Sequence, residues 1–249
     1  MTQFTPYWWQ NQPQYRNTEV PPTKADCVVV GAGFTGLSAA LTLAQAGRDV
    51  VVLDSQAIGF GASTRNGGML GSGHKVSVAD AKKHYGSDIA AQLHCEANDS
   101  LDFTKSLIID HKINCDLQAS GRLRTAWTPQ DYTAMAQANS SLQKIEPFAA
   151  RMIKPNAMTE HINTPLYFGG LLYEGHACVQ PRKLHYGLLQ LALDAGVKVF
   201  GDQPAHSVKP RGSGFCITTK NQSIDCEQVL MATNGYTQSR VSKFLARRV

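Results

Sequence analysis

A glycine-rich segment between two short apolar runs, within residues 26–54, constrains the fold more than any other part of the chain. Cys27–Val30 and Val50–Leu53 are β-branched and uncharged, which predicts two buried parallel strands. Between them lie glycines spaced G-x-G-x-x-G and then Leu37–Ala46, an Ala- and Leu-rich stretch that favours a helix. Gly47 is expected to end this helix. The segment therefore predicts a strand–turn–helix–strand unit of an α/β fold.

The glycine positions, together with the acid after the second strand, predict a dinucleotide site. Gly31 allows a tight turn, Gly33 lets the backbone approach a pyrophosphate, and Gly36 lets the helix pack closely on the strand. The helix N-terminus offers N–H groups and a positive dipole end to phosphates. Asp54 can accept hydrogen bonds from ribose hydroxyls and disfavours the 2′-phosphate of NADP. An ordinary glycine-rich turn is the alternative, but it gives no reason for the acid.

A second glycine-rich stretch, residues 59–73, follows Asp54 and is expected to lack regular helix or strand. The run Ser63–Asn66 adds hydroxyl, guanidinium and amide groups to this backbone. Such a loop suits a polar ligand, because its backbone N–H groups can face a phosphate or a ring edge. A flexible linker is the alternative, and the Arg-Asn pair beside paired glycines argues against it.

The sequence GAGFTGLSAALTLAQAG, then LD, then GFGASTRNGG resembles the FAD-dependent oxidoreductases of the D-amino-acid oxidase type. That group includes glycine and sarcosine oxidases and γ-glutamylputrescine oxidoreductase. The resemblance implies that the first motif holds the ADP half of FAD and that the second passes near the pyrophosphate, ribitol and flavin ring. The cofactor contacts that it implies are Gly31, Ala32, Gly33, Phe34, Thr35, Gly36, Asp54, Gly61, Ala62, Ser63, Arg65, Asn66, Gly67 and Gly68.

Segments after residue 175 return to the pattern of a nucleotide-binding domain. A helix is predicted from Pro181, with a buried strand at Val197–Phe200. Phe215–Thr219 and Ser223–Cys226 predict a hairpin, and Gln228–Ala232 predicts a last strand. The resemblance implies an adenine contact and a turn beside the cofactor at Ala205, Ala232, Thr233, Asn234 and Gly235.

Residues 86–175 have a different character and predict an inserted α+β region. Apolar residues at three- and four-residue spacing predict one long helix from Ser87 to about His111. Thr128 as N-cap and Pro129 in the first turn predict a second helix. Its expected buried face is Tyr132, Met135, Leu142 and Ile145. Members of the family build their substrate domain here, so the resemblance implies a cap over the flavin.

The predicted fold class is α/β, a Rossmann-like FAD-binding domain of the glutathione-reductase type with an inserted α+β substrate or cap domain. The expected parts are an N-terminal arm at 1–24, a discontinuous FAD-binding domain at 25–85 and 176–235, the insertion at 86–175, and the start of a truncated second half at 236–249. Relatives continue beyond this last segment, so the resemblance implies an N-terminal fragment whose C-terminal part is missing. Aromatic residues of the arm, Tyr7, Trp8 and Trp9, are expected to anchor it on the domain surface rather than to line a substrate entrance or contact a partner.

Composition narrows the class of protein. The net charge is +5, spread along the chain, which suits a protein that binds anions, and the sequence lacks the basic, aromatic-interleaved run expected for nucleic-acid binding. The six cysteines and eight histidines show no metal-binding spacing. Unpaired thiols in apolar runs, without a signal peptide, predict a cytoplasmic protein. The uncharged stretch Cys27–Gly47 is expected to be a buried strand and helix rather than a membrane span, because three glycines interrupt it.

The favoured function is an FAD-dependent oxidation of a primary or secondary amine, either an amino acid or a polyamine derivative. Hydride would pass from the carbon that bears the neutral amine to the flavin, and the imine would then hydrolyse. Oxygen or an electron carrier would accept the electrons. Catalytic residues are not identified, and His74 is the one histidine to test. Arg65 is expected to favour reduced flavin, to orient a carboxylate or to pair with the pyrophosphate.

Two alternatives remain open at this point. An NAD-dependent dehydrogenase explains residues 26–54 but not the GASTRNGG stretch or the return of the nucleotide-binding pattern. A truncated flavin-binding remnant would bind FAD without turnover.

Overall fold

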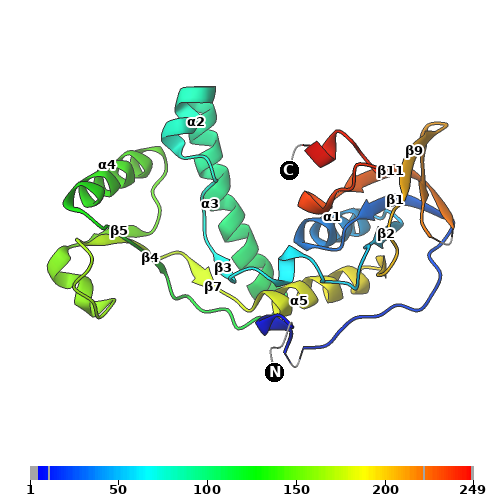
Figure 1. Ribbon diagram of the computed structural model, residues 1–249, viewed down its shortest axis with the longest axis horizontal. Helices are drawn as coiled ribbons and strands as arrows, with labels where there is room; N and C mark the ends of the chain where they lie inside the picture. The colour runs from blue at the N-terminus through cyan, green and yellow to red at the C-terminus, as the bar shows by residue number, and fades with distance from the viewer. Residues whose placement is uncertain (1–4, 11, 221, 248–249) are drawn as a thin grey trace. The chain divides into compact units, whose positions relative to one another are not determined.

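The computed structural model describes residues 5–10, 12–220 and 222–247 and consists of two compact units. Unit 1 contains Met1–Gly67 and Pro181–Val249, and unit 2 contains Gly68–Gln180 (Figure 1). Each unit is described by itself.

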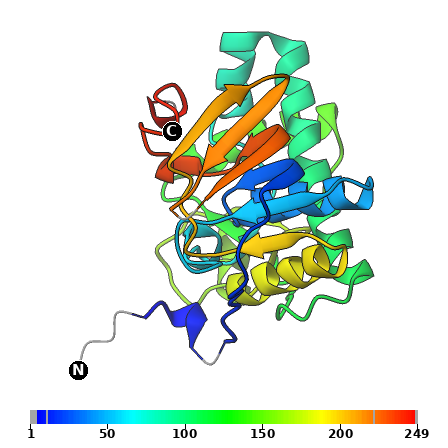
Figure 2. The ribbon, with the colours of Figure 1, turned by 90° about the vertical axis from the view of Figure 1, so that its right-hand side faces the viewer.

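The centre of unit 1, over its described residues, is a six-stranded sheet with the order β8-β2-β1-β11-β10-β9. Its parallel strands are β1 (Lys24–Val30), β2 (Val50–Leu53), β8 (Lys198–Phe200) and β11 (Ser223–Met231). Its antiparallel edge consists of β9 (Ser207–Arg211) and β10 (Gly214–Thr218). Figure 2 shows these strands as a twisted fan from β8 in yellow to β9 in orange.

The apolar runs of the sequence form the buried centre of this sheet. All four residues of β2 are buried, as are the last four of β1, so the predicted strands are confirmed. Burial along a whole run, rather than at alternate residues, is typical of a parallel strand covered on both faces. α1 (Phe34–Gln45) and α5 (Pro181–Asp194) pack against each other beside the sheet (Figure 1). The βαβ unit predicted from the glycine fingerprint is therefore present.

Glycines end both helices of unit 1 as expected. Gly47 follows α1 with φ +80°, and Gly196 follows α5 with φ +88°. An L-residue rarely adopts this left-handed conformation, which glycine reaches without steric cost.

One prediction for unit 1 is wrong. Ser223–Cys226 and Gln228–Ala232 were expected as two separate strands, whereas β11 is one continuous strand. Its pairing with β1 runs through both halves, from Lys24 opposite Asp225 to Val30 opposite Met231. Glu227 was expected to lie between two strands because it is charged. It lies inside β11, because the backbone pairs with β1 on both sides of it.

Unit 2 combines helices with small antiparallel sheets. The described helices are α2 (Val78–Tyr85), α3 (Ser87–Asp110) and α4 (Pro129–Ile145). One sheet has the order β4-β6-β5, formed by Arg122–Thr125, Gly170–Tyr173 and Ala150–Ile153. In the other, β3 (Met69–Leu70) pairs with β7 (Ala177–Cys178).

The two long helices of unit 2 begin where the sequence predicts. Thr128 caps α4 in a capping box, in which its hydroxyl accepts the Asp131 N–H at 3.1 Å. The buried face of α4 differs from the prediction. Ile145 of α4 is exposed, and the predicted core residues Tyr132, Met135 and Leu142 are only half-buried. A three-stranded sheet is too small a surface to bury a helix face fully.

The division into units differs from the predicted domain boundaries. Residues 68–85 and 176–180, expected in the FAD-binding domain, group with unit 2. Strand pairing gives the reason, because β3 pairs with β7 and α2 contacts α3. The functional domain boundaries remain a prediction, since compactness alone does not assign them.

Candidate functional site

A cavity of about 290 Å³ lies in unit 1 where β1, β2 and β11 end. Its walls come from the residues that follow these strands and from the second glycine-rich stretch. Ligands of open α/β sheets bind in the crevice outside the carboxyl ends of the strands. The position is therefore the one expected for a nucleotide.

Most of the predicted cofactor contacts line this cavity. They are Gly31, Ala32, Gly33, Phe34, Thr35, Asp54, Gly61, Ala62, Ser63, Ala205, Ala232, Thr233 and Asn234. Other predicted contacts lie outside the lining, namely Gly36, Arg65, Asn66, Gly67 and Gly235, while Gly68 belongs to unit 2. The structure thus brings together five segments of the sequence, residues 31–35, 54, 61–63, 205 and 232–234.

Some lining residues were missed by sequence reasoning. They are Val30, Ser55, Gln56, Gly59, Phe60, Pro204, Met231, Tyr236, Thr237, Gln238 and Val241. Ser55 and Gln56 directly follow Asp54, and Tyr236 directly follows the ATNG turn. Ser55, Gln56 and Tyr236 could have been predicted by extending each motif by one or two residues, because the end of a strand and the turn after it line the same cavity.

The first turn, Gly31–Gly36, requires its glycines for different reasons. Gly31 has φ +111°, and a Cβ there would lie 2.6 Å from the Ala232 carbonyl oxygen. A Cβ on Gly36 would collide with the Gly31 carbonyl. Gly33 has an ordinary extended backbone, but its Cβ would lie 2.8 Å from Ser63 Oγ. Gly33 therefore allows the first turn and the second loop to approach each other.

Polar contacts fix the first turn from two sides. The Ala32 N–H donates to Asp54 Oδ2 at 2.9 Å, and the Phe34 N–H donates to Ser63 Oγ at 3.0 Å. The Gln56 N–H donates to Asp54 Oδ1 at 3.1 Å. Burial raises the pKa of the Asp54 carboxyl, and these backbone hydrogen bonds oppose the shift. Asp54 is thus held rigidly, and each of its oxygens keeps acceptor capacity for a hydroxyl.

Phosphate binding in this cavity would depend on the backbone. Among the described residues that line it, none is a lysine or arginine. The N-terminus of α1 faces the cavity through Phe34 and Thr35, and an α-helix leaves its first N–H groups without intrahelical acceptors. These groups and the helix dipole form an anion site that needs no basic side chain.

The second glycine-rich stretch was expected to lack helix and strand, but Ala62–Thr64 forms a short 3-10 turn and Met69–Leu70 is strand β3. The N-terminal arm is anchored on this loop, as expected. Trp9 Nε1 donates to Thr64 Oγ1 at 2.8 Å, and Trp8 Nε1 donates to the Asn66 carbonyl at 2.8 Å. The Arg65 guanidinium lies 4.7 Å from the centroid of the Trp9 ring. A cofactor role for Arg65 stays a prediction, since its partners here are the arm and its own loop.

His74 lies in unit 2 and makes structural contacts there. Its Nε2 is 2.9 Å from the Leu93 carbonyl oxygen and 3.2 Å from a Glu96 carboxylate oxygen. Both partners belong to α3. A catalytic role for His74 remains a prediction. The alternative is that His74 attaches its own segment to α3.

The described residues hold no group of three His, Cys, Asp or Glu side chains able to bind a metal ion, and no disulfide. None of the helices described is long and apolar enough to cross a membrane.

The fold and the cavity together define a dinucleotide-binding α/β protein. Residues 26–249 match the family model described as FAD dependent oxidoreductase, and the chain belongs to this family. The family distinguishes FAD from NAD, which the fingerprint in residues 26–54 could not do.

Relatives of known sequence support the same assignment. The chain is 30% identical over 223 residues to γ-glutamylputrescine oxidoreductase of Escherichia coli, a match that covers 90% of this chain and 52% of the relative. It is 28% identical over 213 residues to the probable oxidoreductase OrdL of Haemophilus influenzae, covering 85% and 49%. The chain therefore spans about half the length of the curated relatives it matches.

Solved structures show the same fold. Glycine oxidase from Geobacillus kaustophilus has a TM-score of 0.74 at 19% identity, covering 89% of this chain and 58% of that one. An L-amino acid deaminase from Proteus myxofaciens has a TM-score of 0.72 at 17% identity, covering 89% and 48%. The predicted fold class is confirmed.

Proposed function

We propose that the protein binds FAD through unit 1 and oxidises a primary or secondary amine, either an amino acid or a polyamine derivative. The observation that carries this proposal is the cavity at the carboxyl ends of β1, β2 and β11, built from a glycine turn, a helix N-terminus and Asp54. The names of the relatives, which include a γ-glutamylputrescine oxidoreductase and a glycine oxidase, support an amine as the substrate.

The residues present fit the ADP half of FAD. The cavity is lined by the first glycine turn, the start of α1 and Asp54, which are the groups that bind the pyrophosphate and ribose of a dinucleotide. The cavity of about 290 Å³ is at the lower end of the range for small-molecule pockets, roughly 300–1,000 Å³. It is large enough for part of a dinucleotide rather than the whole molecule.

Each wall of the cavity has an assigned part in this proposal. N–H groups at the start of α1 bind the pyrophosphate, and Asp54 accepts hydrogen bonds from the ribose hydroxyls. Ala205 would contact the adenine, and Ala232, Thr233 and Asn234 would contact the cofactor from the turn after β11. The Gly235 N–H donates to Asn234 Oδ1 at 2.6 Å, which fixes this last turn.

FAD, when bound, supplies the acceptor for the electron pair that leaves the amine carbon. The part of the protein is to bind and orient the cofactor and to exclude water from the reacting atoms. We further propose unit 2 as part of the substrate region, oxygen or an electron carrier as the final acceptor, and the cytoplasm as the location. Thiols outside any disulfide agree with a reducing compartment.

Anaerobic mixing of the FAD-loaded protein with amines tests this function. Glycine, sarcosine, putrescine and γ-glutamylputrescine are added in turn, and the visible flavin band is followed. We expect at least one amine to bleach the band, whereas glycolate, which lacks the amino group, leaves it unchanged. Reduction by dithionite confirms that the flavin is competent. A flavin that dithionite bleaches and that none of the amines reduces contradicts amine oxidation and favours the remnant without turnover.

A further inference from the structure

Two buried basic side chains lie one turn apart at the start of α5, beneath the candidate cofactor site. Arg182 is 5% exposed and His185 is 2% exposed. Residues three apart lie on the same face of a helix, so the two side chains point to the same side of α5. Neither lines the cavity, and each contacts a different loop that does.

Arg182 holds the second loop and the N-terminal arm. Its Nη1 donates to the carbonyls of Ile58 and Gly59, at 3.2 and 3.3 Å. Its Nη2 donates to the Pro13 carbonyl at 2.9 Å. A Cβ on Gly59 would collide with Nη1, so glycine at this position leaves the room that the guanidinium needs.

His185 holds the first turn. Its Nε2 is 2.7 Å from the Ala32 carbonyl oxygen. Burial, first of all, lowers the pKa of His185 to about 4, and the nearby Arg182 charge acts in the same direction. The imidazole is therefore neutral at pH 7, and because a carbonyl can only accept, Nε2 carries the proton. The backbone of Ala32 is thus held on both sides, its N–H by Asp54 and its carbonyl by His185.

Stability alone gives a poor reason for these residues. A guanidinium buried against carbonyl groups loses its hydration, and replacing buried charges by apolar residues of similar volume is often neutral or stabilising. Arg182 and His185 are 124 and 153 residues away from the carbonyls of Ile58 and Ala32 that they bind. α5 is therefore a common support for two loops that the sequence does not connect closely.

We propose that Arg182 and His185 are positioning residues, which hold the first turn and the second loop at the separation that FAD requires. The proposal rests on the proposed function, since it assumes that the cavity between these loops takes FAD. Without the two side chains the loops would sample several separations, of which only some fit the cofactor. The apparent affinity for FAD then falls in proportion to the fraction of molecules whose loops are at the competent separation.

Matched substitutions separate the loss of the hydrogen bonds that hold the loops from the loss of core packing. Arg182→Met and His185→Met keep length and volume but remove the donors. Arg182→Lys keeps the charge and one donor nitrogen, and His185→Gln keeps a donor near the place of Nε2. Leu189→Ala is the control, because Leu189 is 1% exposed in α5, has no hydrogen-bonding group to hold a loop, and its truncation weakens the core.

The measurements are the FAD dissociation constant, the visible circular dichroism of the bound flavin, and urea unfolding without FAD. We expect the two Met variants to raise the dissociation constant about tenfold or more, as for one competent molecule in ten, and to change the flavin dichroism. His185→Gln should restore most of the affinity and Arg182→Lys part of it. Leu189→Ala should lower the unfolding midpoint and leave the affinity and dichroism unchanged.

The outcomes distinguish this proposal from the one it rests on. A wild-type protein that takes up no FAD contradicts both proposals. Wild-type binding together with unchanged affinity in the Met variants overturns the positioning role alone, as does an equal loss of affinity in Leu189→Ala. If the Met variants do not fold, Arg182→Lys decides, because its single nitrogen replaces the two guanidinium nitrogens that bind the second loop and the arm. Unchanged affinity in this variant contradicts the proposal.

Discussion

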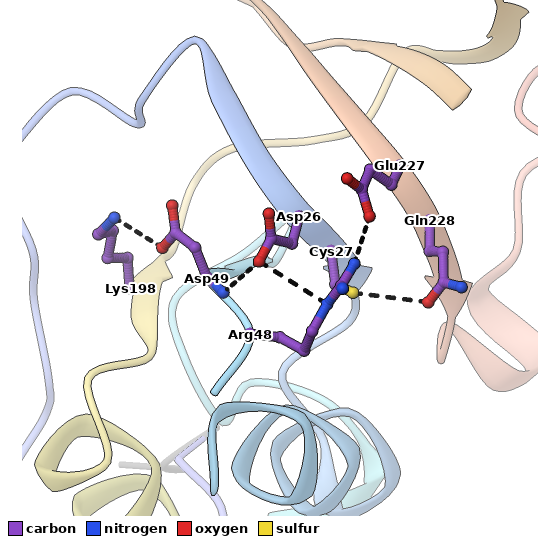
Figure 3. A network of polar contacts seen from close by, with 7 residues as sticks. All are labelled: Asp26, Cys27, Arg48, Asp49, Lys198, Glu227 and Gln228. Atoms are coloured by element: carbon purple, nitrogen blue, oxygen red, sulfur yellow. Dashed lines mark hydrogen bonds and ion pairs between the residues drawn. The ribbon is translucent and has the colours of Figure 1, made fainter. Parts of the chain in front are cut away.

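The two ends of the parallel strands in unit 1 use opposite chemistry. At the amino ends, charged side chains form a network in which Arg48 pairs with Asp26 and Glu227, while Lys198 pairs with Asp49 at 2.8 Å (Figure 3). At the carboxyl ends, the described lining of the cavity has one acid, Asp54, and no basic side chain. Glycine and backbone N–H groups form the site there.

This difference shows why charge density is a poor guide to the site. The Arg48 and Lys198 side chains are 36% and 47% exposed, so water screens their ion pairs. Exposed pairs of this kind are worth about 0–1 kcal/mol each. At the other end, backbone groups line the cavity that we propose for the phosphates and ribose of FAD. On this proposal, the residues that bind the cofactor are those with few charged side chains.

The largest effect is expected from Gly36→Ala at the carboxyl end. The added Cβ would collide with the Gly31 carbonyl, and the helix cannot move away without opening the turn. We expect a loss of about 3 kcal/mol or more in the free energy of unfolding, at the upper end of the overpacking range. Urea unfolding measures it. The control is Gly47→Ala, whose Cβ meets nothing within 4 Å and whose positive φ costs about 1 kcal/mol. Equal losses would contradict the collision.

A pH-dependent loss of stability is expected from His185. Its pKa is about 4 in the folded protein and ordinarily 6.5, so the folded state binds fewer protons between these values. Stability is therefore complete above about pH 6.5 and falls as the pH decreases towards 4, by up to about 3 kcal/mol. Urea unfolding from pH 7 to pH 4.5 should show a steeper fall in the wild type than in His185→Gln. Parallel curves would show that His185 does not remain neutral.

A moderate effect is expected from Asp54→Asn. The amide oxygen can still accept the Ala32 N–H, but the amide NH2 cannot accept the Gln56 N–H, and the charge-assisted bonds to ribose hydroxyls are lost. We expect the FAD dissociation constant to rise about tenfold, which corresponds to roughly 1.4 kcal/mol. The stability of the apo protein at pH 7 should change little, because the lost bond to Gln56 is offset by removal of the buried charge, whose desolvation raises the pKa of Asp54. Flavin fluorescence titration checks the affinity, and unchanged affinity would remove Asp54 from the site.

The smallest effect is expected from Arg48→Met at the amino ends. Its ion pairs with Asp26 and Glu227 are exposed, so their loss should change stability by less than about 0.5 kcal/mol. The FAD affinity should not change at all. A measurable loss of FAD affinity in this variant would contradict the separation of the two ends.

Sequence patterns predicted the parts of the site that depend on neighbouring residues. The glycine spacing predicted the first turn of the site and, in unit 2, Thr128 with Pro129 predicted the start of α4, because each signal lies within a few neighbouring residues. Contacts between distant segments could not be predicted in this way. The bond from the Phe34 N–H to Ser63 and the support of Ala32 by His185 depend on how loops and α5 pack.

The errors have the same physical origin. An apolar stripe identifies the side of α4 that faces the protein, but the size of its partner decides how deeply Ile145 is buried. The burial of Arg182 and His185 was not predicted, because the helical periodicity of α5 is set by apolar residues such as Leu184 and Leu188. Polar side chains that are buried to hold a backbone leave no periodic signal.

Titration of the purified protein with FAD, in parallel with Gly33→Val and Arg48→Met, is the direct test of whether the glycine turn, rather than the charged network, binds the cofactor. Gly33 has φ −81°, which valine tolerates, but its side chain would fill the space between the first turn and Ser63. The account predicts a bound-flavin spectrum in the wild type and in Arg48→Met, and a folded but colourless Gly33→Val. A Gly33→Val protein that holds FAD as tightly as the wild type would contradict it, as would a wild-type protein that stays colourless.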